Sequence, residues 1–360
     1  MKHETLVEGS VGTSRWELFA AANSGKGFYS YYPQVFERDE IDKRYLIKGG
    51  PGTGKSSFLR EVAKRAEEKG AAVEYYRCSS DPDSLDGVIL NRRIALLDAT
   101  APHAVEPSLP GTRDEIVNLG DFWDSRMLEE RRNDISAYSA LKGNCYRKAY
   151  RFLSAAMEVS EGNREMVEPY IRWEKMRRAV KRLMRSVPAG REFQVIPGLM
   201  DSLGMKGEVR LPTYEEQAET LYVLEDSFGI ASAFLSMVIG EAENKKVSLR
   251  VSYQPLCPTL PNGVLLEESG IAFVLESADR EPTGHVNMKR FLDQEGVRQI
   301  RGEYRRNLRL AEGLLQAATD SLADAGQYHF ELEKIYVACM DFRAEQKFIR
   351  SFCQKLLEIL

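Results

Sequence analysis

The chain contains the glycine-rich run Gly49-Gly50-Pro51-Gly52-Thr53-Gly54-Lys55-Ser56. An apolar run, Tyr45-Leu46-Ile47, precedes it, and a helix-forming run from Ser57 to Lys64 follows it. This is the GxxxxGK[ST] spacing of a phosphate-binding loop between a strand and a helix. Glycines let backbone N–H groups converge on a phosphate, and the helix N-terminus adds partial positive charge. A plain glycine-rich turn needs neither the lysine nor the hydroxyl, so we expect a nucleotide site here.

The residue types in this loop predict separate roles. Lys55 is expected to reach the β- and γ-phosphates and to be essential for turnover, and the Ser56 hydroxyl is expected to ligate Mg²⁺. The predicted cofactors are therefore ATP and Mg²⁺, although the choice of adenine depends on the family resemblance described below. The residues expected to contact the nucleotide are Gly49, Gly50, Pro51, Gly52, Thr53, Gly54, Lys55, Ser56 and Ser57.

A second acidic signal follows the loop. Ile94-Ala95-Leu96-Leu97-Asp98 is a short apolar run that ends in an acid, which is typical of a buried parallel strand. Its carboxyl end lies where open α/β sheets bind ligands. This Walker B pattern predicts that Asp98 holds Mg²⁺ directly or through water.

Turnover also needs a group that orients the nucleophile and one that stabilises charge. Ala99 stands where many ATPases carry a glutamate, which argues against a fast ATPase. Asp81, after the strand beginning at Val73, and His103 are candidates for positioning water or a substrate hydroxyl, although His103 also suits a loop cap. Arg113 and the arginines between Trp173 and Arg185 are candidates for the cationic group.

Composition sets broad limits. The 360 residues are 43% hydrophobic and 29% charged, with a net charge of −4, so no global charge attracts nucleic acid or anionic lipid. The five cysteines have no CxxC spacing, which predicts reduced thiols in a cytoplasmic protein. Residues 1–15 read as a polar lead-in without a signal peptide, and no apolar run is long enough for a membrane span. We therefore expect a soluble protein.

From Phe122 to Val187 the pattern changes to long, charged helical runs. The segment Trp173 to Arg185 carries six basic residues, and it suits either a phosphate backbone or, more simply, a solvated helix face. Earlier in the chain, Asn23 to Phe28 is a small glycine–lysine loop that suits either a nucleotide contact or, more simply, a turn. Asp83 to Gly87 also has the composition of a turn.

The second part of the chain resembles a degenerate copy of the first. Ser232-Ala233-Phe234-Leu235 aligns with Ser56-Ser57-Phe58-Leu59 at an offset of 176 residues (232 − 56). In this copy Ala231 replaces Lys55 and Leu275 replaces Asp98, and the loop contains Glu225 and Asp226. Because carboxylates at a helix N-terminus repel phosphate, we expect no ordinary nucleotide binding by the second copy, which has a structural or regulatory role.

The chain resembles a family of bacterial P-loop ATPases built from tandem P-loop modules. The resemblance is carried by Phe19 to Phe28, Leu46 to Ser57, Cys78-Ser79-Ser80-Asp81, Ser84 to Ile89 and Ile94 to His103. It implies ATP binding and ATPase activity without naming a substrate. The missing lysine in the second copy departs from a family in which both modules often carry the loop.

The predicted fold is α/β: a three-layer P-loop NTPase domain with a parallel sheet, duplicated, with a helical extension after each copy. The expected boundaries are 1–121 for the P-loop domain, 122–190 for its helical extension, 191–290 for the degenerate domain and 291–360 for the C-terminal extension. Three functions remain open: a slow ATPase that acts as a nucleotide-dependent switch, a kinase for a small molecule or nucleotide, and a nucleic-acid-associated ATPase. The first is preferred, with a nucleotide and an unidentified protein partner or small-molecule acceptor as expected partners; nucleic acid is less favoured, and a membrane is not expected.

Overall fold

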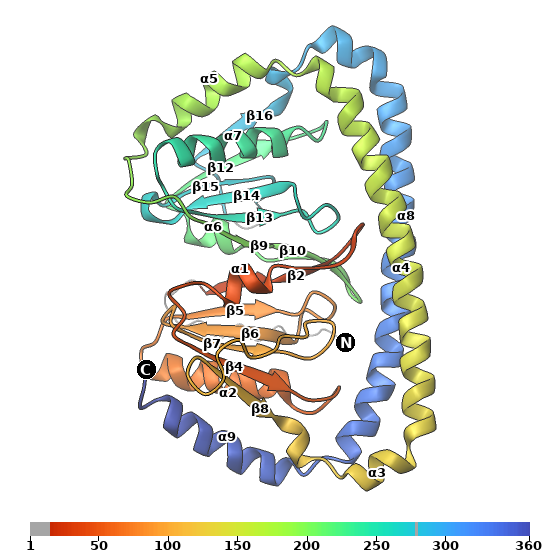
Figure 1. The fold of residues 1–360 in the computed structure, drawn as a ribbon. Helices are drawn as coiled ribbons and strands as arrows, with labels where there is room; N and C mark the ends of the chain where they lie inside the picture. Colours follow the sequence, from red (N-terminus) through yellow and green to blue (C-terminus); the bar gives the residue numbers. More distant parts are fainter. Residues whose placement is uncertain (1–14, 278–279) are drawn as a thin grey trace, which may run out of the picture.

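The computed structural model describes residues 15–277 and 280–360, so the predicted lead-in lies mostly outside the described residues. Two six-stranded sheets are stacked on one side, and a long pair of helices runs along the other (Figure 1). We refer to residues 15–186 as the first half and to residues 195–360 as the second half. Both halves present their elements in the same order, which is compatible with the predicted duplication.

The first sheet has the strand order β1-β5-β6-β7-β4-β8. Strand β4, which precedes the glycine-rich loop, lies between β7, which ends in Asp98, and β8, and pairs with both in parallel. A separate hairpin, β2–β3, follows β1. The strands of this half are β1 (Trp16–Phe19), β2 (Ala21–Ser24), β3 (Gly27–Ser30), β4 (Lys43–Lys48), β5 (Val73–Arg77), β6 (Leu85–Leu90), β7 (Ile94–Asp98) and β8 (Asp114–Asn118).

The second sheet repeats that order as β9-β13-β14-β15-β12-β16, and the hairpin β10–β11 corresponds to β2–β3. The small glycine–lysine loop at Ser24–Gly27 is therefore the turn of a hairpin, as the simpler interpretation expected. The strands of this half are β9 (Val195–Gly198), β10 (Asp201–Gly204), β11 (Gly207–Arg210), β12 (Thr220–Glu225), β13 (Leu249–Tyr253), β14 (Pro261–Leu266), β15 (Ile271–Val274) and β16 (Gly284–Asn287).

The expectation of a parallel sheet is wrong for one strand in each half. β6 runs antiparallel to both β5 and β7, and β14 does the same in the second sheet. The sequence at Asp83 to Gly87 has turn composition, but Leu85, Asp86 and Gly87 belong to β6, which is buried along its length. A chain reversal at Asn91 and Arg92, both at positive φ, then leads directly into β7. A hairpin therefore replaces the helical crossover that a parallel pair would need.

Helices are exchanged between the halves. The long helices α4 and α8 pack side by side, and each carries the chain away from the sheet of its own half. As a result α5 packs on α7 of the second half, and α9 packs on α2 of the first. The longer helices are α2 (Lys55–Glu68), α4 (Arg132–Val167), α5 (Trp173–Leu183), α7 (Ala231–Asn244), α8 (Gln294–Ala338) and α9 (Phe342–Leu356). The end of α2 agrees with the sequence, because Gly70 follows it at φ 85°.

Shorter helices complete the connections between these elements. α1 and α6 lie between the two sheets, and η1 and η5 follow the last strand of each sheet. The short helices are α1 (Tyr32–Phe36), α3 (Ser125–Glu130), α6 (Thr213–Gln217), η1 (Leu119–Phe122), η2 (Glu168–Tyr170), η3 (Met184–Ser186), η4 (Glu267–Ser269) and η5 (Met288–Phe291).

The hydrophobic core follows this exchange. A central cluster contains apolar residues of both sheets, including Leu46 and Leu97 from the first and Leu221 and Val274 from the second. On the outer face of the first sheet, Phe58 of α2 packs against Phe352 of α9 at 5.1 Å between ring centroids. Each half therefore completes its outer layer with a helix from the other half, and neither outer layer is closed by its own contiguous segment.

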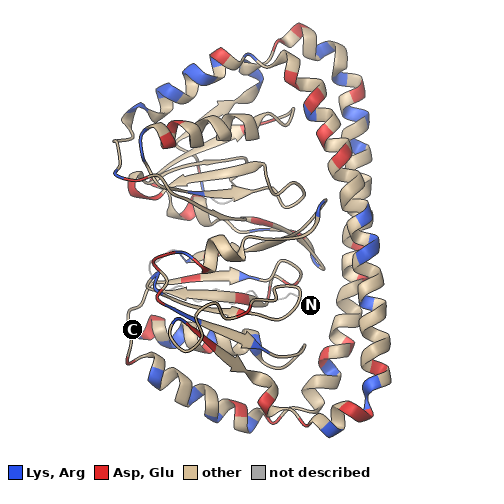
Figure 2. Ribbon diagram, in the orientation of Figure 1, with Lys and Arg blue, Asp and Glu red and all other residues tan. Residues whose placement is uncertain are grey.

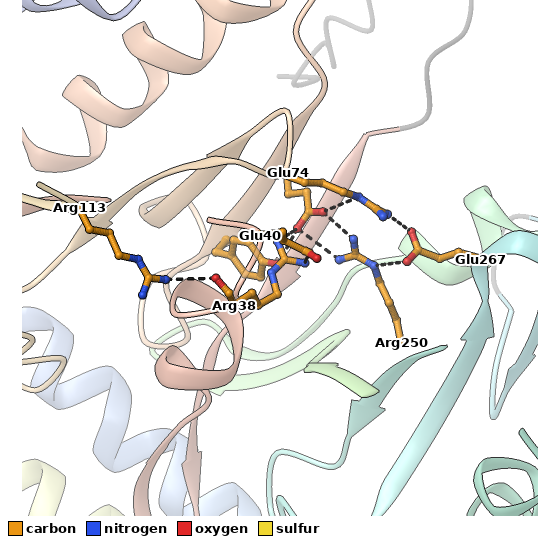
Figure 3. A network of polar contacts seen from close by, with 8 residues as sticks. Arg38, Glu40, Glu74, Arg113, Arg250 and Glu267 are labelled. Atoms are coloured by element: carbon orange, nitrogen blue, oxygen red, sulfur yellow. Dashed lines mark hydrogen bonds and ion pairs between the residues drawn. The ribbon is translucent and has the colours of Figure 1, made fainter. Parts of the chain in front are cut away.

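A buried ion network joins the two sheets (Figure 3). Arg250 of β13 donates to both carboxylate oxygens of Glu74 of β5, at 2.5 and 3.3 Å, and its Nε lies 3.1 Å from Glu267. Burial by itself would raise the pKa of Glu74, but Arg250, then Arg38 and Tyr76, lower it to about 2. Glu74 and Arg250 are 176 residues apart (250 − 74), the offset of the sequence repeat. Residues at corresponding positions therefore meet where the two halves face each other.

Charged residues are unevenly spread along the chain (Figure 2). Lys and Arg positions are frequent on α5, whose Met176, Ala179 and Val180 are buried. This matches the simpler interpretation of the Trp173–Arg185 segment as a solvated helix face. Among the described residues, no helix combines the length and apolar character needed to cross a membrane. The thiols of all five cysteines are free, as expected.

Candidate functional site

The glycine-rich loop connects β4 to α2 at the carboxyl edge of the first sheet. Gly52 has φ 67° and Gly54 has φ 81°, conformations that side chains with a Cβ rarely adopt. Lys55 is the first residue of α2, so the backbone N–H groups of the loop and of the first helical turn lie together. Local sequence thus explains the loop: glycines permit the turn, and the helix begins at the lysine.

The Lys55 ammonium is turned back over this loop. Its Nζ donates to the carbonyl oxygens of Gly49 at 3.0 Å and Gly50 at 2.8 Å, and it lies 3.6 Å from Oδ2 of Asp98. The structure therefore brings together the lysine and the acid that the sequence assigned to one site. The loop is also braced from within, because the Thr53 hydroxyl donates to Gly50 O at 2.9 Å.

Ser56 and Asp98 supply the oxygen atoms expected for a metal. The Ser56 Oγ accepts a hydrogen bond from the Leu85 N–H at 2.9 Å, which directs the hydroxyl toward β6. Asp98 Oδ1 accepts from the Thr100 N–H at 2.9 Å and also from the Thr100 hydroxyl. Burial raises the pKa of Asp98, while Lys55 and Thr100 oppose that shift and the charge of Asp86 adds to it.

A hydroxyl and a carboxylate suit Mg²⁺, which binds few protein ligands and keeps waters and phosphate oxygens. Over residues 15–277 and 280–360, no group of three or more His, Cys, Asp or Glu side chains could hold a metal ion. The donors at this loop therefore fit a metal that arrives with a phosphate ligand, and they do not form a closed protein cage.

A second acid, Asp86, lies beside Asp98 and was missed by the sequence analysis. The register that places Gly87 opposite Leu97 puts Asp86 next to Asp98 across the β6–β7 pair. Asp86 Oδ2 lies 3.2 Å from Nε2 of His103. The apolar run from Val88 to Leu90 was the available signal for a strand, but the Asp-Gly pair suggested a turn instead.

His103 is buried at 8% exposure. Its ring stacks on Tyr32 with 4.4 Å between centroids and meets the edge of Phe28 at 4.8 Å. Its Nδ1 has no hydrogen-bond partner among the described residues. His103 is thus a buried imidazole that packs between Tyr32, Phe28 and the Asp86 carboxylate.

Asp81 is held within its own loop. Its Oδ2 accepts from the Ser84 hydroxyl at 2.7 Å, and Lys206 from the β10–β11 hairpin lies 3.9 Å from its Oδ1. The neighbouring Ser80 accepts from Tyr146 of α4 at 3.1 Å. No contact recorded among the described residues links Asp81 to Lys55, so its expected catalytic role finds no geometric support.

The end of α8 lies against the glycine-rich loop. A Cβ placed on Gly50 would come within 2.6 Å of the Tyr336 ring, and one on Gly52 within 2.9 Å of Val337. The absence of a Cβ on these glycines therefore permits the close approach of α8 as well as the turn. Hydrogen bonding with His329 lowers the pKa of Glu333, with smaller contributions from Lys55 and the Gly52 N–H.

Lys142 of α4 is a further cation near the loop. Burial lowers its pKa, and the charge of Lys55 lowers it further while Glu333 opposes the shift. No sequence signal singles out Lys142, since it lies in a long helix that carries many charged residues.

The arginines named as candidates for charge stabilisation lie elsewhere, so that expectation is wrong for this fold. Arg113 precedes β8 at the amino edge of the sheet, where its guanidinium donates to the Arg38 carbonyl at 3.1 Å. The basic helix α5 packs on α7 of the second half. The positions of Arg113 and α5 follow from the topology, which the spacing of residues in the sequence does not reveal.

The corresponding loop of the second half is filled by its own side chain. Asp226 Oδ1 accepts from the Phe228 N–H at 3.0 Å, and Oδ2 accepts from the Ala231 N–H at 2.6 Å. Burial raises the pKa of Asp226, while the backbone N–H groups of residues 228–231 oppose that shift. The carboxylate occupies the backbone donors that a phosphate would need, which gives a physical reason for expecting no nucleotide there.

Comparison of the chain with protein-family models, with curated proteins and with solved structures found no match. The fold and the site therefore define the class on their own: an α/β protein with two six-stranded mixed sheets and a glycine-rich loop between β4 and α2 that carries a lysine.

Proposed function

We propose that the first half binds a nucleoside triphosphate with Mg²⁺ and hydrolyses it slowly, as a nucleotide-dependent switch. The observation that carries this proposal is the position of Lys55. Its ammonium lies at the N-terminus of α2, between the carbonyls of a glycine-rich loop and the buried carboxylate of Asp98. A cation, converging N–H groups and an acid at a sheet edge suit a metal-bound polyphosphate.

Each residue then has a defined task. The loop N–H groups and the Lys55 ammonium bind the phosphate chain, and the Ser56 hydroxyl and Asp98 carboxylate hold the metal. Bound Mg²⁺ supplies neutralisation of the negative charge that develops on the phosphate oxygens. Lys142 adds positive charge from α4, and His103, oriented by Asp86, suits the positioning of water. ATP as the nucleotide rests on the family resemblance.

Slow turnover and switching are supported by two features. Ala99 follows Asp98 and is fully buried, so the position next to the metal acid offers no base. Tyr336 and Val337 of α8 touch the loop, and α8 extends from there to the second half. A ligand that binds the loop better in one arrangement of α8 than in another shifts the populations of the two arrangements.

The test is binding and turnover by the full chain and by Lys55→Ala, with ATP, GTP and Mg²⁺. Because a charged hydrogen bond is worth about 1.5–3 kcal/mol, Lys55→Ala should weaken binding roughly 10- to 150-fold and abolish measurable turnover. Lys64→Ala, an exposed lysine on the same helix, is the matched control and should behave as wild type. Equal binding and turnover by Lys55→Ala and wild type would refute the proposal.

The alternatives have separate outcomes in the same assay. Release of ADP and phosphate without any acceptor supports hydrolysis, whereas a kinase releases ADP only when an acceptor is added. Stimulation by DNA or RNA that weakens with salt would favour the nucleic-acid alternative through the α5 basic face.

A further inference from the structure

A buried carboxylate from the far end of the chain lies at the glycine-rich loop. Glu345, in the first turn of α9, is 3% exposed. A Cβ placed on Gly54 would come within 2.2 Å of its Oε1, so this carboxyl group lies directly against the residue that precedes Lys55. Its Oε1 has no hydrogen-bond partner among the described residues. The loop and the carboxylate come from opposite halves of the molecule.

Leaving such a group without a partner is unfavourable. A buried acceptor that has lost water and gained no donor costs about 1–3 kcal/mol. Burial raises the pKa of Glu345 to about 7. Lys55, the nearest cation of the loop, is directed toward Gly49, Gly50 and Asp98 instead. The carboxyl group is thus a buried acceptor to which the described residues supply no donor.

The topology indicates which part of a nucleotide would meet Glu345. The metal side of the loop faces β7 and β6, because Asp98 ends β7 and Ser56 bonds to Leu85 of β6. α9 packs instead against η1, which follows β8, and β8 lies on the other side of β4. Glu345 and Asp98 therefore flank the loop from opposite sides.

The chemistry of the Glu345 carboxyl group also assigns it to the nucleoside rather than to the phosphates. In its ionised form Glu345 repels the phosphate chain and accepts hydrogen bonds, so an N–H or O–H group is its complementary partner. In a nucleoside triphosphate such donors belong to the base and to the ribose. Aromatic surface is also present at this loop, since the Tyr336 ring lies against Gly50 and its centroid is 5.9 Å from that of Trp123.

We propose that Glu345 contacts the nucleoside of the bound nucleotide, accepting a hydrogen bond from a base N–H or a ribose hydroxyl. The first half then holds the phosphates and metal, and α9 of the second half recognises the nucleoside. This inference rests on the proposed function, since it assigns a further contact to the same site. It also explains why a helix from the second half covers the first.

The experiment compares Mg·ATP with Mg·tripolyphosphate, which has the phosphates without the nucleoside. Isothermal titration of the full chain is expected to show that Glu345→Ala binds ATP roughly tenfold or more weakly, with tripolyphosphate affinity unchanged. Glu345→Gln keeps a neutral acceptor and should lose less. Gln346→Ala, an exposed neighbour on the same turn, is the control and should match wild type.

Wild-type protein provides a measurement that does not depend on how a variant folds. It should bind tripolyphosphate more weakly than ATP, and either 2′-deoxy-ATP or inosine triphosphate should also bind more weakly. A loss with 2′-deoxy-ATP identifies the ribose as donor, and a loss with inosine triphosphate identifies the base amine.

Three results would overturn the inference. Unchanged ATP affinity in Glu345→Ala refutes it while leaving the proposed function intact, and so does an equal loss of ATP and tripolyphosphate. Wild-type protein that binds neither ligand refutes the proposed function together with this inference.

Discussion

Replacing Arg250 by methionine should lower the free energy of unfolding, because it leaves the Glu74 carboxylate buried without its main partner. Glu74 is 6% exposed and Arg250 is fully buried. The pKa of Glu74 falls from 4.5 to about 2, and at 1.36 kcal/mol per unit this corresponds to about 3 kcal/mol. Breaking a buried pair from one side costs about 3–5 kcal/mol. We therefore expect Arg250→Met to lose about 3–5 kcal/mol of unfolding free energy at pH 7.

The pH dependence of stability provides a second, independent test of this prediction. A carboxyl group whose pKa is lowered on folding stabilises the fold fully above its unfolded value near 4.5. That contribution disappears as the pH falls from about 4.5 toward 2. The difference between wild type and Arg250→Met should therefore be largest near neutral pH and should shrink across this acid range.

Urea unfolding followed by tryptophan fluorescence measures both effects, since the Arg250 guanidinium lies 4.2 Å from the Trp16 ring centroid. Arg178→Met, an exposed arginine of α5, is the control and should change stability by less than about 0.5 kcal/mol. The double variant Glu74→Gln/Arg250→Met should lose less than the sum of the single losses, because no charge then stays unpaired across the pair. A loss below about 1 kcal/mol at pH 7, or an equal loss at pH 7 and pH 3, would refute this reasoning.

Two further predictions concern acids at or beside the glycine-rich loop and its counterpart in the second half. Asp226→Asn places an amide NH₂ against a backbone N–H, so the second half should lose about 1–3 kcal/mol of stability in urea unfolding. It should not gain nucleotide binding, because Ala231 supplies no charge. A new ATP site would contradict this prediction. Asp86→Asn removes a charge that raises the pKa of Asp98, so Mg·ATP binding should persist to lower pH than in wild type. The binding profile between pH 4 and 7 measures this shift, Asp42→Asn on the surface is the control, and a shift toward higher pH would contradict it.

Much of the site depends on residues that are close together in the sequence. The loop and the start of α2 depend on glycines, a lysine and an apolar strand within a dozen residues, so their spacing sufficed to predict them. Asp98 was predicted for the same reason, because a short apolar run that ends in an acid describes one buried strand. The sequence also predicted a duplication, and the matching strand order of the two sheets is compatible with it.

Strand direction was harder to predict. Leu85-Asp86-Gly87 has the composition of a turn, and only pairing with β5 and β7 makes it the antiparallel strand β6. Asp86 thereby reaches Asp98 and His103, a juxtaposition that depends on register. Register is a property of two strands together, so neither strand's sequence reveals it alone.

The sequence alone predicts the glycine-rich loop with its lysine, the apolar strand that ends in Asp98, and an alanine at position 231 where the first half has Lys55, because each depends on neighbouring residues. The tertiary structure alone decides that Glu345 lies against the loop and that the charge of Lys55 reaches Lys142, whereas Arg113 and α5 lie elsewhere. α4 and α8 carry the chain between halves, so these contacts join residues far apart in sequence. The physical reason is the helix exchange: the helix that covers each sheet, α2 or α7, packs against a helix of the other half.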